Sequence, residues 1–194
     1  MKKIVLATSN PHKVEEINAI TSGLGIEFIM PPEGFDPEET GLTFEENALI
    51  KAKEANKLTN MPTLADDSGL CVDALGGGPG IYSARYADSP TARIKKLLKE
   101  LKDVPEENRT AKFVCAMALL DENGNVLFAD RGECHGKIGY GVKGQNGFGY
   151  DPVFVIEGKN LTMSELSEND KNRLSHRANA LNKVIDFIQR KHLT

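Results

Sequence analysis

The chain has 194 residues, of which 40% are hydrophobic and 27% are charged, and its net charge is −4 at pH 7. This length suits one domain over residues 1–194, and the hydrophobic fraction excludes a globally disordered chain. The acidic balance argues against a nucleic acid as the main partner, because proteins that bind one usually carry a basic face.

Neither the cysteines nor the N-terminus points to an exported or membrane protein. Cys71, Cys115 and Cys134 are odd in number and lack CxxC spacing, so they predict no disulfide framework or zinc site. The apolar run near the N-terminus is too short for a signal peptide, and no stretch approaches the roughly 20 apolar residues of a membrane span. We therefore expect a cytoplasmic protein with no membrane partner.

The first third of the chain predicts strands alternating with helices. The apolar run Ile4–Ala7 is typical of a buried strand, and apolar residues at helical spacing follow it. These residues are Val14, Ile17, Ile20 and Leu24. A second strand is expected in IEFIM, before a loop rich in proline. Thr43 and Glu46 match a capping box, which predicts a helix to about Leu58. Its inward face would carry Phe44, Ala48, Ala52 and Ala55.

The strand PTLA leads into Asp66 and Asp67, which we place at its end, before a glycine-rich loop. Serine and proline at Ser89-Pro90 predict the next helix start, because serine caps and proline fits the first turn. Two strands, Ala111–Leu120 and Val126–Cys134, flank the hairpin signal DENGN.

Near the C-terminus, DPVFVI predicts a further strand, and an amphipathic helix is expected from about His176 to His192. Helices and strands alternate early and a hairpin comes late. The fold class is therefore α/β with a mixed sheet and flanking helices, and this alternation is compatible with one lobe or two.

The segment TSNPHK joins the first strand to the first helix. A helix start exposes backbone amides that favour anions, and the segment adds hydroxyls and a lysine. Its residues are Thr8, Ser9, Asn10, Pro11, His12 and Lys13. The pattern is not a Walker loop, since GxxxxGK[ST] is absent. A capped turn with a solvated lysine is the alternative interpretation.

Two acidic segments form the second candidate. Glu38 and Glu39 lie in a loop, and Asp66 and Asp67 follow a strand. Carboxylates from two such places can share a hard cation such as Mg²⁺, which keeps several waters and bridges to phosphates. Two solvated acidic turns are the alternative. The adjacent pair does not supply the Asp-x-Asp that nucleophilic-aspartate phosphatases need.

The segment GFGYDPVF and a cationic group form the third candidate. Phe148 or Tyr150 can stack on a flat ring as aromatic side chains do on bases, with backbone near the ring edge at Gly149 and Asp151 beside it. Lys171, His176 and Arg177 are cations grouped near a predicted helix start, the unfavourable end for the helix dipole. A tight turn and an ordinary charged helix start are the alternatives.

Six motifs in order now point to a family. They are ATSNPHKVEEI, EETGLTFEENALIKA, ADDSGL, GGGPGIYSARYA, GFGYDPVF and SHRANAL. The set resembles the noncanonical purine nucleoside triphosphate pyrophosphatases, the HAM1-like family of inosine and xanthosine triphosphate pyrophosphatases, from Ile4 to about Leu181. The resemblance implies an elongated mixed sheet with two lobes around a central cleft, and a homodimer. It also implies magnesium-dependent hydrolysis of ITP, dITP and XTP to the monophosphate and pyrophosphate, which keeps deaminated purines out of the nucleotide pool.

The resemblance also implies roles for the motif residues. The turn from Thr8 to Lys13 and the cation Lys51 would hold the phosphates, and Asp67 would be the catalytic base. The metal would be held by Glu38 or Glu39 with Asp66 and Asp67. Ser68 would touch the substrate, and the base would be surrounded by Phe148, Gly149, Tyr150, Asp151, Lys171, His176 and Arg177. The match departs where the family often has glycine in place of Ser9 and His12.

Two other functions are weighed against this one. A Maf-type nucleotide pyrophosphatase, acting on pyrimidine or modified nucleotides, would share the fold and the early phosphate turn, but the SHR helix start argues against it. A non-catalytic nucleotide sensor is opposed by the intact acidic pair and lysines. An assay of pyrophosphate release over several nucleotides separates these alternatives.

Overall fold

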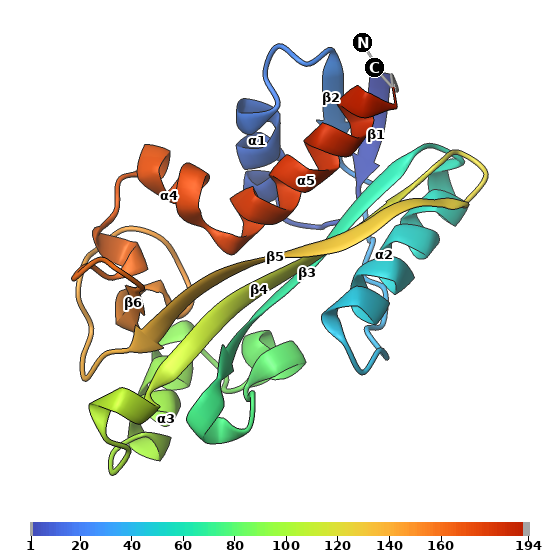
Figure 1. Ribbon diagram of the computed structural model, residues 1–194. Coiled ribbons are helices and arrows are strands. Elements are labelled where there is room, and N and C mark those ends of the chain that lie inside the picture. Colours follow the sequence, from blue (N-terminus) through green and yellow to red (C-terminus); the bar gives the residue numbers. More distant parts are fainter. Residues whose placement is uncertain (1, 192–194) are drawn as a thin grey trace. The chain divides into compact units, whose positions relative to one another are not determined.

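The computed structural model, drawn as a ribbon in Figure 1, describes residues 2–191. The chain divides into two compact units. Unit 1 contains the chain up to Asp67, Cys115–Gly132 and the chain from Ala180 on; unit 2 contains Ser68–Val114 and Glu133–Asn179. Three long strands contribute residues to both units. They are β3 (Thr63–Val72), β4 (Thr110–Leu120) and β5 (Val126–Ile138).

Unit 1 begins with two parallel strands and the helix that connects them. The elements are β1 (Lys2–Leu6), α1 (Pro11–Ile20) and β2 (Ile26–Ile29), and α5 (His176–Arg190) contributes most of its length. Strand β1 pairs in parallel with both β2 and β3. Ile4 and Leu6 share one core with Ile17 of α1 and Leu181 of α5. Because side chains alternate along a strand, these two helices cover the same face of the sheet.

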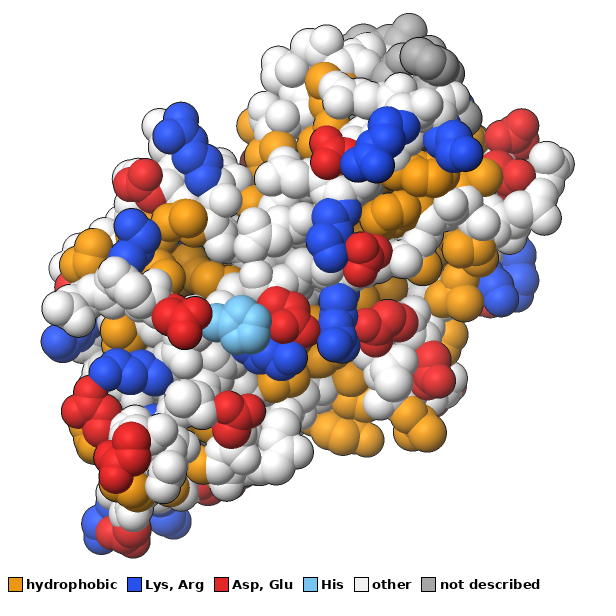
Figure 2. Space-filling view, viewed as in Figure 1, with side chains coloured by type: hydrophobic (Ala, Val, Ile, Leu, Met, Phe, Trp, Pro, Cys, Tyr) orange, Lys and Arg blue, Asp and Glu red, His pale blue; other side chains and the backbone are white. Residues whose placement is uncertain are grey.

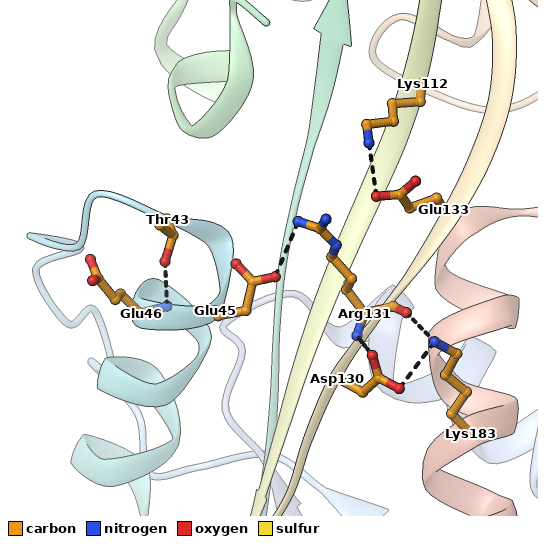
Figure 3. A network of polar contacts seen from close by, with 8 residues as sticks. All are labelled: Thr43, Glu45, Glu46, Lys112, Asp130, Arg131, Glu133 and Lys183. Carbon is orange, nitrogen blue, oxygen red and sulfur yellow. Dashed lines mark hydrogen bonds and ion pairs between the residues drawn. The ribbon is translucent and has the colours of Figure 1, made fainter.

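Helix α2 (Phe44–Thr59) is fixed at both ends by its own sequence. The Thr43 hydroxyl accepts the N–H of Glu46 at 3.1 Å, drawn in Figure 3, and Asn60 ends the helix in a left-handed conformation. The Glu46 carboxylate accepts from the backbone N–H of Leu42 rather than that of Thr43. The predicted cap is therefore confirmed, and its reciprocal bond lies one residue earlier. The predicted inward face is buried.

Unit 2 packs α-helices and several short turns around a second core. Helix α3 (Pro90–Glu100) begins at the predicted Ser89 cap, whose hydroxyl accepts the Ala92 N–H. The remaining elements are β6 (Phe154–Ile156) and α4 (Glu168–Leu174). Arg109 is 1% exposed, and its guanidinium donates to backbone carbonyls of Leu101, Ile138 and Gly139. A buried arginine thus joins the end of α3 to the segment that follows β5.

The sheet order is β2-β1-β3-β4-β5-β6. The parallel pairs at β1 and the antiparallel pair of β5 with β6 make the sheet mixed. The predicted α/β class with a mixed sheet and flanking helices is confirmed. The expectation of an elongated shape with two lobes around a cleft concerns the placement of the units and stays a prediction, as does the single domain. None of the helices within residues 2–191 has the length and apolarity needed to cross a bilayer.

Several predicted boundaries are wrong by a few residues. Asp66 and Asp67 lie inside β3 rather than at its end, because the extended backbone continues through Val72. Helix α1 ends at Ile20, so Leu24 lies beyond it, in the turn that precedes β2. Strand β5 is longer than expected, and β6 covers only the last three residues of DPVFVI. Helix α5 is described to Arg190, and the predicted end at His192 lies outside the described residues.

Candidate functional site

The TSNPHK turn joins β1 to α1 as predicted, and a hydrogen bond to the Thr8 side chain closes it. The Thr8 hydroxyl accepts the N–H of Asn10 at 3.1 Å, and proline occupies the first position of α1 at Pro11. Ser9, Asn10 and Pro11 are exposed, and the side chain of His12 lies outside the described part. The turn therefore presents polar groups at a helix start, as an anion site requires.

The carboxylates of the two adjacent aspartates pair with separate lysines. Consecutive residues of a strand point to opposite faces. Asp66, which is 1% exposed, has both oxygens 3.0 Å from Lys13 Nζ, whereas Asp67 Oδ1 lies 3.2 Å from Lys51 Nζ. The repulsion between two adjacent carboxylates is therefore relieved within the protein itself. Lys13 comes from α1 and Lys51 from α2, so each carboxylate connects β3 to a different helix.

Lys51 also pairs with the loop that carries the two glutamates. Its Nζ lies 2.7 Å from Glu39 Oε1, while Glu38 is exposed. Burial lowers the pKa of Lys51, but the carboxylates of Asp66, Asp67 and Glu39 outweigh it and leave the pKa above its ordinary value. Lys51 is therefore a firmly charged cation placed between two acidic segments.

For the pKa of Asp67, burial outweighs the effect of the neighbouring lysine. Burial raises the pKa of the Asp67 carboxyl, and the Lys51 ammonium offsets only part of that shift. Its second oxygen, Oδ2, is buried and has no hydrogen-bond partner among the described residues. An aspartate with a raised pKa and a free oxygen has the properties of a general base.

The neighbouring glutamates of α2 serve structural roles. Glu45 Oε1 lies 3.4 Å from Arg131 on β5, and Figure 3 shows this pair beside the contacts of Lys183 with Asp130 and with the Arg131 carbonyl. These contacts join α2, β5 and α5 within unit 1. Figure 2 shows that cationic and acidic side chains also lie interspersed over the viewed face of the molecule.

The acidic residues fit a metal that is shared with phosphates. Within residues 2–191, no group of three or more His, Cys, Asp or Glu side chains is arranged to hold a metal ion. Mg²⁺ is usually bound by only one or two carboxylates, with waters and substrate phosphates completing its shell. The hard oxygens of Glu39 and Asp67, among them the unpartnered Oδ2 atom of Asp67, fit that arrangement, whereas Asp66 points to the other face of β3 and pairs with Lys13.

In unit 2, a second group of predicted residues surrounds Phe148. The ring of Phe148 is 61% exposed, and Lys171 Nζ and the Arg177 guanidinium lie 4.5 Å and 5.9 Å from its centroid. Asp151 Oδ2 accepts from Lys171 Nζ at 2.6 Å and from the Phe148 N–H at 2.9 Å. A side chain at Gly147 would meet this oxygen at 2.2 Å, so the turn requires glycine.

His176 is held by stacking on a core ring. Its imidazole lies 4.9 Å from the ring of Phe113 at an angle of 17°, and Phe113 also contacts Phe154 at 4.5 Å. His176 and Arg177 open α5 as predicted. Lys171 instead lies in the separate helix α4, since the chain turns at Ser175 between the two helices. The cations are therefore grouped, but not on one helix start.

Of the two aromatic candidates, only Phe148 has an accessible ring. Tyr150 is 5% exposed and its hydroxyl donates to the Ser83 carbonyl at 2.8 Å. Its ring belongs to the core of unit 2, so stacking by Tyr150 is not possible. Gly149 has a positive φ of 60° between the two aromatics, and Ser68 is half-buried in β3. Substrate contacts of these last two residues stay predictions.

A family model described as the Ham1 family matches residues 4–187. The chain belongs to the Ham1 family. A dITP/XTP pyrophosphatase of Haemophilus ducreyi is 50% identical over 188 residues, which cover 92% of this chain and 94% of that protein. A HAM1 protein from Coxiella burnetii has a TM-score of 0.90 at 40% identity, covering 98% of this chain and all 100% of that one. The Staphylococcus aureus Ham1 protein gives 0.89 at 41% identity, with the same coverage.

Membership in the Ham1 family confirms the resemblance inferred from the six motifs and decides against the Maf-type alternative. Two buried residues beside the predicted site were missed by sequence reasoning. Asn47 contacts the loop of Glu39, and Phe113 stacks on His176. Asn47 stands in the quoted motif EENALIKA, where a polar residue on the inward side of a helix was a readable signal. Phe113 is one apolar residue in an apolar strand, so no signal distinguished it.

Proposed function

We propose that this Ham1 protein hydrolyses the triphosphates of deaminated purines, dITP, ITP and XTP, to the monophosphate and pyrophosphate. The name of the Haemophilus ducreyi relative supports the substrate class. The observation that carries the proposal is the buried contact between Lys51 and Asp67, with Glu39 on the same lysine. It combines a cation for phosphate with a carboxylate suited to act as a base.

We assign the triphosphate to the residues of unit 1. The turn from Thr8 to Lys13 and the cation Lys51 bind phosphate oxygens, since a helix start and ammonium groups favour polyanions. Asp67 takes the proton of the attacking water through its free oxygen. Phosphoryl transfer depends on such positioning and on neutralisation of charge.

We assign the purine base to the residues of unit 2. The exposed ring of Phe148 stacks on the base, and His176 or Arg177 donates to the carbonyl at purine position 6. Asp151 or a backbone carbonyl accepts from the ring N–H beside it. Adenine carries an amine and a ring acceptor at these two positions. A site that would leave buried polar groups unpaired rejects the wrong ligand by roughly 10⁴–10⁵.

Ham1 membership implies a divalent metal ion, and we propose that it is Mg²⁺. Asp67 and Glu39 would hold it together with the phosphates. Asp66, which faces Lys13, and Glu38, which is exposed, would not. When bound, the metal neutralises phosphate charge and lowers the pKa of bound water. We further propose a homodimer that acts in the cytoplasm. Light scattering coupled to size exclusion tests the dimer, since a monomer mass would contradict it.

The test is pyrophosphate release from a set of nucleotides, with Mg²⁺ and with EDTA. We expect rapid release from dITP, ITP and XTP, slow release from ATP and GTP, and none in EDTA. The Asp67→Asn protein, prepared in the same way, controls for contaminating phosphatases. Hydrolysis of ATP as efficient as that of ITP would rule out the proposed specificity. Binding of ITP without turnover would favour the nucleotide sensor.

A further inference from the structure

Asn47 is a fully buried asparagine in the first turns of α2, with 0% exposure. Its Oδ1 accepts the backbone N–H of Gly41 at 2.8 Å. Because that N–H is a donor, the amide atom facing it must be the oxygen, which leaves the NH₂ group on the other side. The orientation of the Asn47 amide is therefore fixed by the backbone.

The contact with Gly41 holds the loop that carries Glu39. A Cβ at Gly41 would lie 2.6 Å from Asn47 Oδ1 and 2.7 Å from Glu46 Cβ, so the backbone here approaches α2 as closely as glycine permits. The Glu46 carboxylate accepts the next N–H along the loop at 2.6 Å. Two residues before Gly41, Glu39 reaches Lys51 at 2.7 Å. The amide of Asn47 thus anchors the loop next to one of its functional carboxylates.

The other end of the same amide faces the predicted base. Asn47 lies close enough to Asp67 to act on its carboxyl group, lowering the pKa that burial raises. Asn47 Nδ2 and Asp67 Oδ2 are both buried, and neither has a hydrogen-bond partner among the described residues. A buried donor without a partner is unfavourable and rare in folded proteins, so a functional role is one physical reason for it to be kept.

We infer that Asn47 is a positioning residue for two functional carboxylates, acting on Glu39 through the Gly41 loop and on Asp67 through the buried NH₂ group that lies near it. The inference rests on the proposed function, because it assigns those carboxylates to catalysis. Asn47 orients them and leaves the chemistry to them. A misplacement of about 1 Å at a reacting group can lower the rate by roughly 10²-fold.

The chain offers variants that separate the two ends of the amide. Asn47→Asp keeps an oxygen for the Gly41 N–H but replaces the donor toward Asp67 with a second oxygen. Asn47→Ala removes both contacts. Asn56→Asp is the matched control, because Asn56 is a buried asparagine of the same helix whose Nδ2 donates, among the residues that the structure describes, to the carbonyls of Met61 and Asp121, 2.8 Å each.

Steady-state kcat and KM for dITP are measured with the melting temperature and the hydrogen exchange of the Gly41 amide in metal-free protein. We expect both Asn47 variants to lose roughly 10²-fold in kcat with KM changed less than about threefold. Gly41 exchange should rise at least about tenfold in Asn47→Ala and stay near wild type in Asn47→Asp. Asn56→Asp should melt earlier yet keep kcat within about threefold of wild type.

The inference is overturned if Asn47→Asp keeps kcat near the wild-type value, if Gly41 exchange is unchanged in Asn47→Ala, or if Asn56→Asp loses as much kcat as Asn47→Asp. Failure of the proposed function has a different signature. A wild-type protein inactive on dITP would contradict the substrate assignment, whereas the exchange of Gly41 would still report the loop contact.

Discussion

In unit 1 the predicted functional lysines pair with carboxylates, whereas in unit 2 the predicted functional cations also lie over an aromatic ring. Lys13 and Lys51 each face an aspartate of β3. Lys171 and Arg177 lie over the ring of Phe148. Lysines that pair with carboxylates suit a negatively charged ligand, because its phosphates can replace the carboxylates beside the lysines. Ring contacts suit a flat, uncharged base, for which shape and hydrogen bonds decide binding. Unit 1 therefore has the chemistry that suits a polyphosphate, and unit 2 has the chemistry that suits a flat base.

The largest expected effect is in unit 1. Asp67→Asn keeps the shape of the side chain but removes the base, so kcat for dITP should fall by roughly 10²–10⁴. Pyrophosphate release measures it, and circular dichroism checks the fold. Near-normal turnover by a folded Asp67→Asn protein would remove Asp67 from the role of base.

Asp67→Asn also tests how the Asp67 carboxyl affects the stability of the fold. The folded pKa of Asp67 is raised above its unfolded value, so this carboxyl favours folding at low pH and disfavours it as pH rises through the folded pKa. Asparagine does not titrate. In EDTA at neutral pH, Asp67→Asn should therefore melt no lower than wild type. A lower melting temperature would mean that the contact with Lys51 stabilises the fold more than burial of the charge destabilises it.

The next largest effect separates the triphosphate from the nucleoside. Lys51→Ala should weaken binding of ITP by roughly 10–10²-fold, since a hydrogen bond to a charged group is lost, while binding of inosine changes little. Lys13→Ala should act in the same direction. Calorimetric titration in EDTA measures both ligands without turnover. Lys57→Ala is the control, because Lys57 is an exposed lysine of α2 that pairs only with Glu54 among the described residues. Equal losses for ITP and inosine would place the lysines outside the phosphate site.

The sequence predicted the elements of unit 1 well because local signals fix them. The Thr43 cap, the apolar run of β1 and the proline at the start of α1 act within a few residues. Strand ends were less predictable, since β3 continues past Asp67 through residues whose pairing depends on distant strands.

The candidate site divides in the same way. The motifs predicted that Lys51 and Asp67 belong to the site, but they did not predict the side chains with which these residues pair. The sequence suggested a metal as the cation for the two aspartates, and the fold places lysines from two helices beside them. Tyr150 and Phe148 were equal candidates for stacking, because only tertiary packing decides which ring is buried.

In unit 2, Arg177→Ala should reduce base selectivity. Arg177 is 3% exposed and lies beside Phe148, so its removal deletes a buried donor near the proposed base. We expect kcat/KM for dITP to fall by about tenfold, and that for dATP to fall less. Arg173→Ala, in the exposed part of α4, is the control. An equal loss for both nucleotides would assign Arg177 to the phosphates or to the fold.

The smallest expected effect tests whether the core ring under His176 contributes to base choice. Phe113→Leu keeps an apolar side chain but removes the stacked ring, and an aromatic pair contributes about 0.5–1.5 kcal/mol beyond its buried area. The kcat/KM for dITP should therefore fall by about twofold to tenfold, with a smaller change for dATP, because a less restrained imidazole donates less well. Phe128→Leu is the control. It removes a ring pair of unit 1, Phe128 with Phe187 at 5.3 Å, which does not involve His176. If Phe113→Leu lowers the melting temperature as Phe128→Leu does and leaves the ratio of dITP to dATP hydrolysis unchanged, the ring serves only the core. A reduced ratio in Phe113→Leu alone would show that in unit 2 base selectivity depends on ring packing, as we propose that catalysis in unit 1 depends on the placement of charge.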